Sequence, residues 1–497
     1  MTKKHHIQTA FLIFILSLPV HLIAAEKNLK KLSAKQKQDD NYSDKHSINR
    51  FPSSDQLDLR FPVEKYQLKN GLTVLLNEDH SIPMVSFHTW YKVGSKEEHE
   101  GVTGAAHMLE HMMFKGAKKY TGKDFDRILH ENGVTNNAFT TNDYTGFYEN
   151  LPSSKLELIM DMEVDRMRSL AIRPEDLKSE LQVVTEERRW RTDNTPTGRL
   201  REIFFAEIFK GHPYAWPVIG WMKDIEAYTS EKLRKFFDTY YVPNNAVLVL
   251  SGDFKSDAAK KLIAKYYDDL PYRSVPKAEV SFTKTPMQSS QKDTGHSSAV
   301  SSSALSNKLV LITKAINKEV KDHVQTPMMV LGFQSPESGQ KESYQLDLLA
   351  ELLGNGLSSR LHSKLVYESA LASSVGAYNQ TMKEAGVFTI QVNSRNKTNK
   401  AAIENMVWSE ISNLQKKVVT DKELRKAKNR LLNQYVDGLT TIDGKAQALA
   451  INEILFGDYS RLFQDLSEYE AVTVEQIQSV AKKYLNKNQS VKVWLVP

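Results

Sequence analysis

The spacing of apolar positions predicts regular secondary structure between residues 63 and 254. Residues 66–76 read as two strands on either side of Asn70-Gly71, the residue pair typical of a tight hairpin turn. Further strands are predicted over 84–93, 137–149 and 246–251, and helices over 156–170, 174–191 and 230–240. This order indicates an α+β unit in which antiparallel strands form one side and helices pack on the other.

A similar order of elements returns in the second half of the chain. We predict a strand over 327–333, a helix over 344–353, a strand over 386–392 and helices over most of 399–484. The repetition indicates two homologous α/β-roll domains, each an antiparallel sheet with helices on one face. They are expected to span 59–281 and 308–497. Where the first domain has its histidines, the second has Tyr344-Gln345-Leu346-Asp347, so it keeps the shape without a metal site.

Three segments lie outside these domains. Residues 1–25 begin with lysines, continue with the apolar run 10–18 and end on Ala25, which is the order of a cleavable secretory signal. The apolar run is too short for a comfortable membrane span, and an uncleaved membrane anchor is the alternative. Residues 26–58 are mostly polar and predict a disordered tether, whereas the Ser-rich stretch 282–307 predicts a linker.

The composition narrows the class of protein. A chain of 497 residues can bury an extensive core, and without cysteine it has no disulfide framework. The net charge of +6 is slight, and part of it belongs to residues 1–58, so nucleic acid is not an expected partner. The signal predicts a periplasmic protein, attached to the membrane only if the signal is not cleaved.

The candidate chemistry lies in His107-Met108-Leu109-Glu110-His111. Histidines four residues apart lie on one face of a helix, so both imidazoles can reach one cation. Glu110 leans over the same patch without having to bind the metal. The order His-x-x-Glu-His is the inverzincin pattern, for which zinc is the usual metal. In a chain with 14 histidines, a chance occurrence is the alternative.

The residues around the motif favour a metal over chance. The residues of this helix are apolar on nearly every face, which predicts that the helix is buried. Buried histidines and a buried glutamate need compensating partners, and a divalent cation supplies one.

A catalytic zinc typically has three protein ligands and one open position, so a third ligand is needed. The predicted helix 174–191 places Glu180 and Glu187 seven residues apart and therefore on one side. Glu187 is the expected third ligand, and Glu180 the carboxylate that supports the site from the second shell of contacts. The alternative is that both are solvated charges on a charge-rich helix.

The sequence around these residues resembles the pitrilysin/insulinase family of zinc peptidases, especially its bacterial and mitochondrial processing-peptidase-like branch. The resemblance is carried by residues 94–98, 104–116, 137–140, 212–214, 218–220, 241–246 and 252–254. It extends less specifically over the rest of the chain from about residue 61. In that family the third ligand is a glutamate about 76 residues past the second histidine, and 187 − 111 = 76 falls on Glu187.

This resemblance implies a fold, a cofactor and an activity. The two halves would form a clam-like half-chamber for unfolded peptides. One Zn²⁺ per chain would be held by His107, His111 and Glu187, with Glu110 as the catalytic base of a metalloendopeptidase. An extended peptide would pair with an edge strand formed by Asn137, Ala138, Phe139 and Thr140. An ordinary core strand is the alternative for that segment.

One departure from the family pattern concerns the second half. Family members that work alone carry there an Arg and, seven residues later, a Tyr that hold the substrate carbonyl. The register after residues 356–361 places these positions at Val366 and Ser373, which cannot do so. Arg360 and Tyr367 are also seven apart, but Arg360 belongs to the preceding Ser-Ser-Arg-Leu turn, so we interpret this pair as a coincidence.

Two functions from different classes follow. The first is a periplasmic zinc endopeptidase whose Arg and Tyr come from a sister subunit, or from a second copy in a homodimer. The second is a non-catalytic peptide-binding or scaffold subunit of a peptidase-like complex. Intact metal ligands and an intact base favour the first, because a scaffold has no use for an open metal site.

Overall fold

The computed structural model describes residues 59–276, 309–395 and 399–497. Residues Phe61–Pro497 belong to one compact unit. The expected signal, tether and linker lie outside the described residues. Within the described part of the chain, no helix is long and apolar enough to cross a membrane.

The first half contains a six-stranded mixed sheet in the order β1-β2-β6-β3-β5-β4. Its strands are β1 Glu64–Gln67, β2 Thr73–Glu78, β3 Met84–Tyr91, β4 Thr135–Thr140, β5 Thr145–Pro152 and β6 Ala246–Gly252. The predicted hairpin around Asn70-Gly71 is present as β1 and β2. Gly71 has φ +87°, a left-handed conformation that suits glycine. The edge of the sheet farthest from this hairpin is β4.

Helices of the first half pack on one face of this sheet around a core of apolar side chains. They are α2 Ala105–Met112, α3 Gly122–Glu131, α4 Leu156–Ser169, α5 Pro174–Arg188, α7 Met222–Ile225, α8 Ser230–Tyr240 and α9 Ser256–Tyr267. A π-helical turn, η6 Arg189–Asp193, extends α5, and α6 Pro196–Ile208 follows it. The predicted helices over 156–170 and 230–240 are therefore confirmed as α4 and α8, and the helix predicted over 174–191 changes to a π-helix after residue 188.

The second half repeats this plan with a five-stranded sheet in the order β7-β11-β8-β10-β9. Its strands are β7 Ile316–Lys321, β8 Met328–Ser335, β9 Ala372–Thr381, β10 Gly386–Ser394 and β11 Ser490–Val496. Its helices are α10 Lys341–Leu353, α11 Lys400–Lys416, α12 Asp421–Gly438, α13 Ile442–Phe456, α14 Leu462–Ala471 and α15 Val474–Tyr484. The repetition read from the sequence is thus confirmed as two halves that each combine a sheet with helices.

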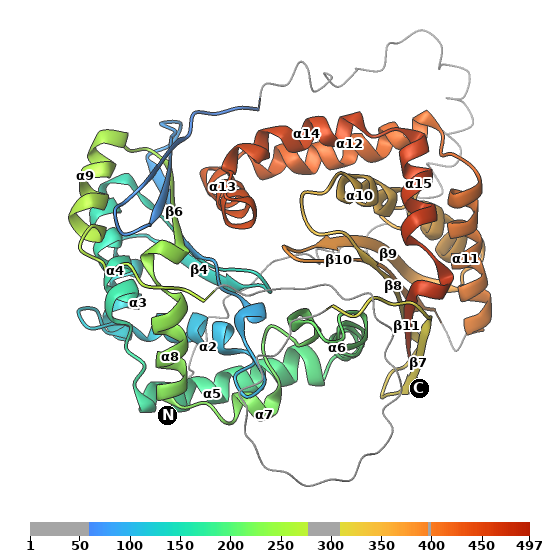
Figure 1. Ribbon diagram of the computed structural model, residues 1–497, viewed down its shortest axis with the longest axis horizontal. Helices are drawn as coiled ribbons and strands as arrows, with labels where there is room; N and C mark the ends of the chain where they lie inside the picture. Colours follow the sequence, from blue (N-terminus) through green and yellow to red (C-terminus); the bar gives the residue numbers. More distant parts are fainter. Residues whose placement is uncertain (1–58, 277–308, 396–398) are drawn as a thin grey trace, which may run out of the picture. The chain divides into compact units, whose positions relative to one another are not determined.

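In each half, the second face of the sheet is covered by a helix that comes from the other half (Figure 1). Apolar residues of α13 pack on β2, β3 and β6, and apolar residues of α6 pack on β8, β10 and β11. Gly332 of β8 makes room for the second contact, because a Cβ there would lie 2.2 Å from the ring of Phe204. The helices of each half that pack on its own sheet lie on one face, as expected, and the helix from the other half adds a cover on the second face. Every residue of β6 is buried, as a strand covered on both faces requires.

Two further expectations need correction. The single strand predicted over 137–149 is a hairpin, in which a turn at residues 141–144 separates β4 from β5. Thr141 stabilises this turn, because its backbone N–H and its hydroxyl both donate to the carbonyl of Tyr144. The sheets are also not wholly antiparallel, since β2 pairs with β6 and β7 pairs with β11 in parallel.

The turn between β4 and β5 is tied to the second half through buried polar contacts. Asp143 accepts a hydrogen bond from the hydroxyl of Tyr214 at 2.6 Å and another from the backbone N–H of Lys383 at 3.0 Å. The neighbouring Glu384 lies 2.8 Å from Lys96 Nζ and 3.0 Å from His212 Nε2. These contacts hold the turn after the edge strand in place from both halves of the chain.

Candidate metal centre

Three side chains from two helices converge at one point. His107 and His111 lie one turn apart on α2, and Glu187 comes from the last turn of α5. One ligand atom from each residue lies within 4.8 Å of the other two. Glu187 Oε2 is 3.3 Å from His111 Nε2 and 3.7 Å from His107 Nε2. The structure therefore brings together the three residues expected to hold the metal.

The environment sets the protonation of these groups. Burial lowers the pKa of His107 to about 3, so its imidazole is neutral and able to coordinate a cation. Burial opposes the charge on His111 as well, but hydrogen bonds to Glu180 and Glu187 outweigh it and raise its pKa to about 10. Burial likewise disfavours ionised Glu187, but the hydrogen bond with His111 and the charges nearby lower its pKa to about 2. A metal that binds here therefore displaces a proton from His111.

Glu180 lies behind His111, as the sequence suggested. Its Oε2 is 3.1 Å from His111 Nδ1, and its Oε1 is 2.5 Å from Lys115 Nζ. A carboxylate only accepts hydrogen bonds, so Nδ1 carries the proton and Nε2 is free to coordinate. The burial of Glu180 is thus explained by two partners, and it is not a solvated charge.

The donor set fits zinc. Two imidazole nitrogens and one carboxylate oxygen make a known set of protein ligands for catalytic Zn²⁺. His107 Nδ1 is buried without a hydrogen-bond partner among the described residues, and His107 Nε2 is too far from Glu187 Oε2 for a hydrogen bond. A buried polar atom without a partner costs folding free energy, and a cation between His107 Nε2 and Glu187 would give Nε2 a partner.

Glu110 is held beside the ligands by the neighbouring sheet. Its side chain is buried, and the hydroxyl of Thr140 donates a 2.6 Å hydrogen bond to its Oε2. Burial raises the pKa of Glu110 to about 7, which is suitable for a group that takes up and returns a proton near neutral pH. Thr140, predicted as part of a substrate strand, therefore also orients the candidate base.

Sequence reasoning missed the residues that fix the start of the metal helix. Buried Glu98 accepts hydrogen bonds from the backbone N–H groups of Gly104 and Ala106, at 2.7 and 2.9 Å. Gly104 has φ +88°, and a Cβ there would lie 2.4 Å from the carbonyl oxygen of Ile219. An acidic residue shortly before a glycine and a helix was the available signal, since carboxylates stabilise helix N-termini.

The four residues expected to bind substrate lie on β4, and β4 is an edge strand, as expected. Among the strands of the described residues, β4 pairs with β5 alone, and Asn137, Ala138, Phe139 and Thr140 belong to this pairing. Ala138 and Phe139 are buried, and the Phe139 ring packs edge-on against Trp90 at 5.0 Å. The backbone edge of β4 therefore lies next to the candidate base, because Thr140 belongs to it.

Val366 and Ser373, the two positions that depart from the family pattern, make contacts within the second half of the chain. Val366 packs against the second core, and the hydroxyl of exposed Ser373 donates to the carbonyl of Asn393 at 3.1 Å. The alternative pair is Arg360 and Tyr367, of which the first is engaged in hydrogen bonds and the second is exposed. Arg360 donates to Glu423 through Nε and Nη2, and Tyr367 is exposed beside the His362 ring.

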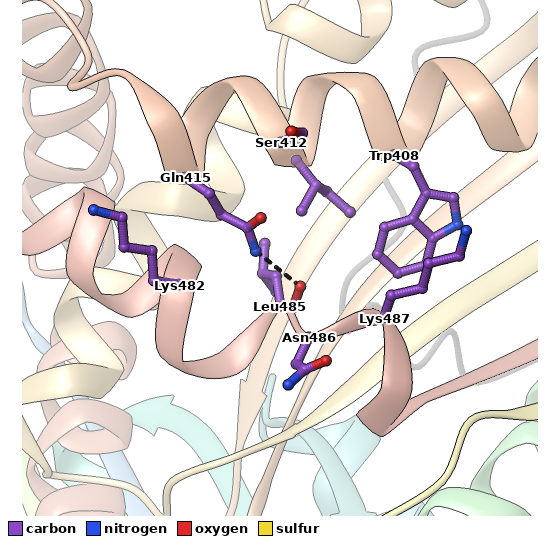
Figure 2. A pocket seen from close by; sticks show the side chains of 8 residues that line it. Trp408, Ser412, Gln415, Lys482, Leu485, Asn486 and Lys487 are labelled. Atoms are coloured by element: carbon purple, nitrogen blue, oxygen red, sulfur yellow. Dashed lines mark hydrogen bonds between the residues drawn. The ribbon is translucent and has the colours of Figure 1, made fainter.

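A shallow groove of about 450 Å³ lies on the second half, between α11 and α15 (Figure 2). Its lining residues are Trp408, Ile411, Ser412, Gln415, Lys482, Leu485, Asn486 and Lys487. Gln415 donates to the carbonyls of Ala481 and Leu485, and the Lys487 ammonium lies 5.5 Å from the Trp408 ring. The lining contains neither histidine nor carboxylate, so this groove offers no metal ligands and no acid–base pair.

Comparisons with known proteins identify a peptidase family and relatives that are named zinc proteases. The insulinase family, peptidase family M16, matches residues 73–220, and the M16 inactive domain matches residues 227–431. The zinc protease PqqE of Helicobacter pylori is 31% identical over 441 residues, which cover 87% of this chain and 93% of that protein. An uncharacterized zinc protease of Bacillus subtilis, YmxG, is 24% identical over 433 residues, covering 86% and 97%.

Solved structures share the fold. A protease from Helicobacter pylori superposes with a TM-score of 0.79 at 29% identity, covering 88% of this chain and all of that one. The periplasmic protease PqqL of Escherichia coli superposes with a TM-score of 0.69 at 18% identity, and this chain covers 48% of it. With the metal site, the two halves and these relatives in agreement, the chain belongs to the insulinase family of peptidases, family M16.

Proposed function

We propose that this protein is a periplasmic zinc metalloendopeptidase that hydrolyses unstructured peptides. The observation that carries the proposal is the convergence of His107, His111 and Glu187 within 4.8 Å, beside Glu110. A zinc ion held there would supply Lewis acidity to the attacking water and to the peptide carbonyl. The position of β4 at the edge of the described sheet supports an extended substrate, because strand addition satisfies the peptide backbone with little demand on its sequence.

The chain's own groups account for the proton transfers. Glu110 takes a proton from the attacking water and returns it to the leaving amine. Thr140 keeps one carboxylate oxygen of Glu110 in place, and Glu180 keeps the His111 ring in the orientation that presents Nε2. An enclosed substrate chamber, as the family resemblance implies, would restrict access to flexible chains.

Metal analysis tests the ligand set. Purified wild-type protein should hold about one equivalent of zinc, and His107→Ala and Glu187→Gln should each lose most of it, because the remaining two ligands bind weakly. Matched controls are His130→Ala and Glu186→Gln, which remove exposed side chains of the same types. Full zinc retention by His107→Ala or Glu187→Gln would show that other residues hold the metal.

The periplasmic location rests on the first 25 residues, whose charged, apolar and small positions follow the order of a secretory signal. We expect the mature chain to begin near Glu26 in the periplasmic fraction of cells that express it. Amino-terminal sequencing of fractionated protein decides this. An intact Met1 in the cytosolic fraction would contradict it.

We further propose that the active species is a pair of chains, with this one as the zinc-bearing subunit. The argument is that Val366 and Ser373 stand where an Arg and a Tyr would contact the substrate carbonyl. A sister subunit of similar length could supply both groups, and a second copy of this chain is the alternative partner.

A non-catalytic role is the second candidate function. Val366 and Ser373 favour it, because neither can replace the Arg and Tyr of the family pattern. The intact ligands and base argue against it, since an unused open metal site would destabilise a scaffold through its buried charges. Zinc binding without hydrolysis, with or without a partner, would support the scaffold role.

A further inference from the structure

A cationic side chain borders the metal centre and has no role in the mechanism above. Beyond Glu187 the chain leaves α5 for the π-helical turn η6, whose wider hydrogen bond runs from Asn194 N to Arg189 O at 2.7 Å. Such turns are frequent at functional sites. Here the turn carries Arg191, whose Nη1 lies 2.8 Å from Glu187 Oε1.

The two carboxylate oxygens of Glu187 face different groups. Oε2 faces the Nε2 atoms of both histidines, and Oε1 faces Arg191. The Arg191 side chain is 41% exposed, so donors of its guanidinium remain open to a further acceptor. Its contact with Glu187 places the guanidinium next to a residue of the candidate metal centre.

A divalent cation held by His107, His111 and Glu187 would change the balance of charge around Arg191. Glu187 then has to neutralise both a dication and a guanidinium. Glu180 is already paired with Lys115 and His111, and Glu110 accepts a hydrogen bond from Thr140. The half-exposed guanidinium of Arg191, which shares Glu187 with the metal, can therefore attract a negatively charged substrate group.

We propose that Arg191 is a substrate-binding residue that selects peptides with an aspartate or glutamate next to the scissile bond. The inference rests on the proposed peptidase function and names the substrate class of that same site. A planar guanidinium suits a carboxylate because two of its N–H groups can donate in parallel. The competing explanation is that Arg191 only positions Glu187 for the metal.

Three peptides, identical except for Glu, Gln or Lys beside the cleaved bond, test the proposal. The wild type should prefer the Glu peptide over the Gln peptide by about tenfold in kcat/KM, mainly through KM. Arg191→Gln should lose this preference, and Arg191→Glu should favour the Lys peptide. The control is Arg189→Gln, because Arg189 lies on the same turn but pairs with exposed Glu186.

Two measurements independent of turnover accompany the kinetics. Zinc content of Arg191→Gln should match the wild type, whereas a pure positioning role predicts a loss of zinc that excess zinc reverses. Calorimetric binding of the same peptides to zinc-loaded Glu110→Gln protein should show the same order of affinities. A wild type that cleaves the Glu and Gln peptides equally well, or an Arg191→Gln variant that keeps the preference, would overturn the inference and leave the peptidase function intact. If the wild type cleaves none of the peptides, either alone or with a sister subunit, the peptidase function fails, and equal binding of the three peptides then overturns the inference separately.

Discussion

A Glu110→Gln variant should keep its zinc and hydrolyse an unstructured peptide about 10²–10⁴-fold more slowly than the wild type, which is the usual effect of losing general-base catalysis. The amide has the shape of the carboxylate, and its oxygen can still accept the hydrogen bond that Thr140 donates to Glu110. It cannot take up the proton of the attacking water. The loss should therefore appear in turnover, with zinc content and folding unchanged.

Thr140→Val provides the matched comparison for this experiment. It removes the hydroxyl that orients Glu110 but leaves the base itself, so the rate should fall less than in Glu110→Gln. Turnover and zinc content should be measured on the same preparations. Near-normal hydrolysis by Glu110→Gln would remove Glu110 from the mechanism, even if all three ligands were correct.

The purified single chain should hydrolyse peptides poorly, and a sister subunit that carries the missing Arg and Tyr should raise the rate by about 10²–10³-fold. This range corresponds to the effect of one lost oxyanion-stabilising donor in other enzymes. Val366 offers no hydrogen bond, and the Ser373 hydroxyl donates to the carbonyl of Asn393. Arg360 cannot replace them, because Glu423 already accepts from its guanidinium.

The measurement compares the single chain with the reconstituted pair on one unstructured peptide. The double variant Val366→Arg and Ser373→Tyr should recover only part of the rate in the single chain, because its neighbours do not orient the new side chains. A partner prepared without its Arg and Tyr is the control and should leave the rate low. Robust zinc-dependent cleavage by the single chain, unchanged by any partner, would show that other residues here fill that role.

Local sequence patterns predicted much of the metal centre. The four-residue spacing of His107 and His111 determines that both face one way on a helix, whatever surrounds it. Apolar neighbours on every side predicted the burial of that helix, which the structure has. Glu187 required more, because nothing local links a residue on α5 to one on α2. Its assignment came from the spacing implied by the family resemblance.

The contact of Arg191 with Glu187 is local. In the sequence Arg191 is one of several basic residues that follow Glu187, and charge-rich helix ends are usually solvated. Its spacing of four residues from Glu187 nevertheless suits a contact on one helix face, as that of three residues suits Arg189 and Glu186. The structure adds that the first pair borders the candidate metal centre, whereas the second is exposed.

The sequence by itself determined the elements, the duplication of the two halves and the residues of the metal helix, because periodicity and turn residues act over a few positions. The tertiary structure decided which apolar surfaces meet. The sequence predicted β6 as a strand, but it is buried on both faces, and its second cover, α13, lies almost 200 residues away in the chain. The exchange of α6 and α13 between the halves and the parallel strand pairs depend on long-range packing. Contacts between apolar side chains are not directional, so a local pattern predicts that a surface is buried but does not predict which element covers it.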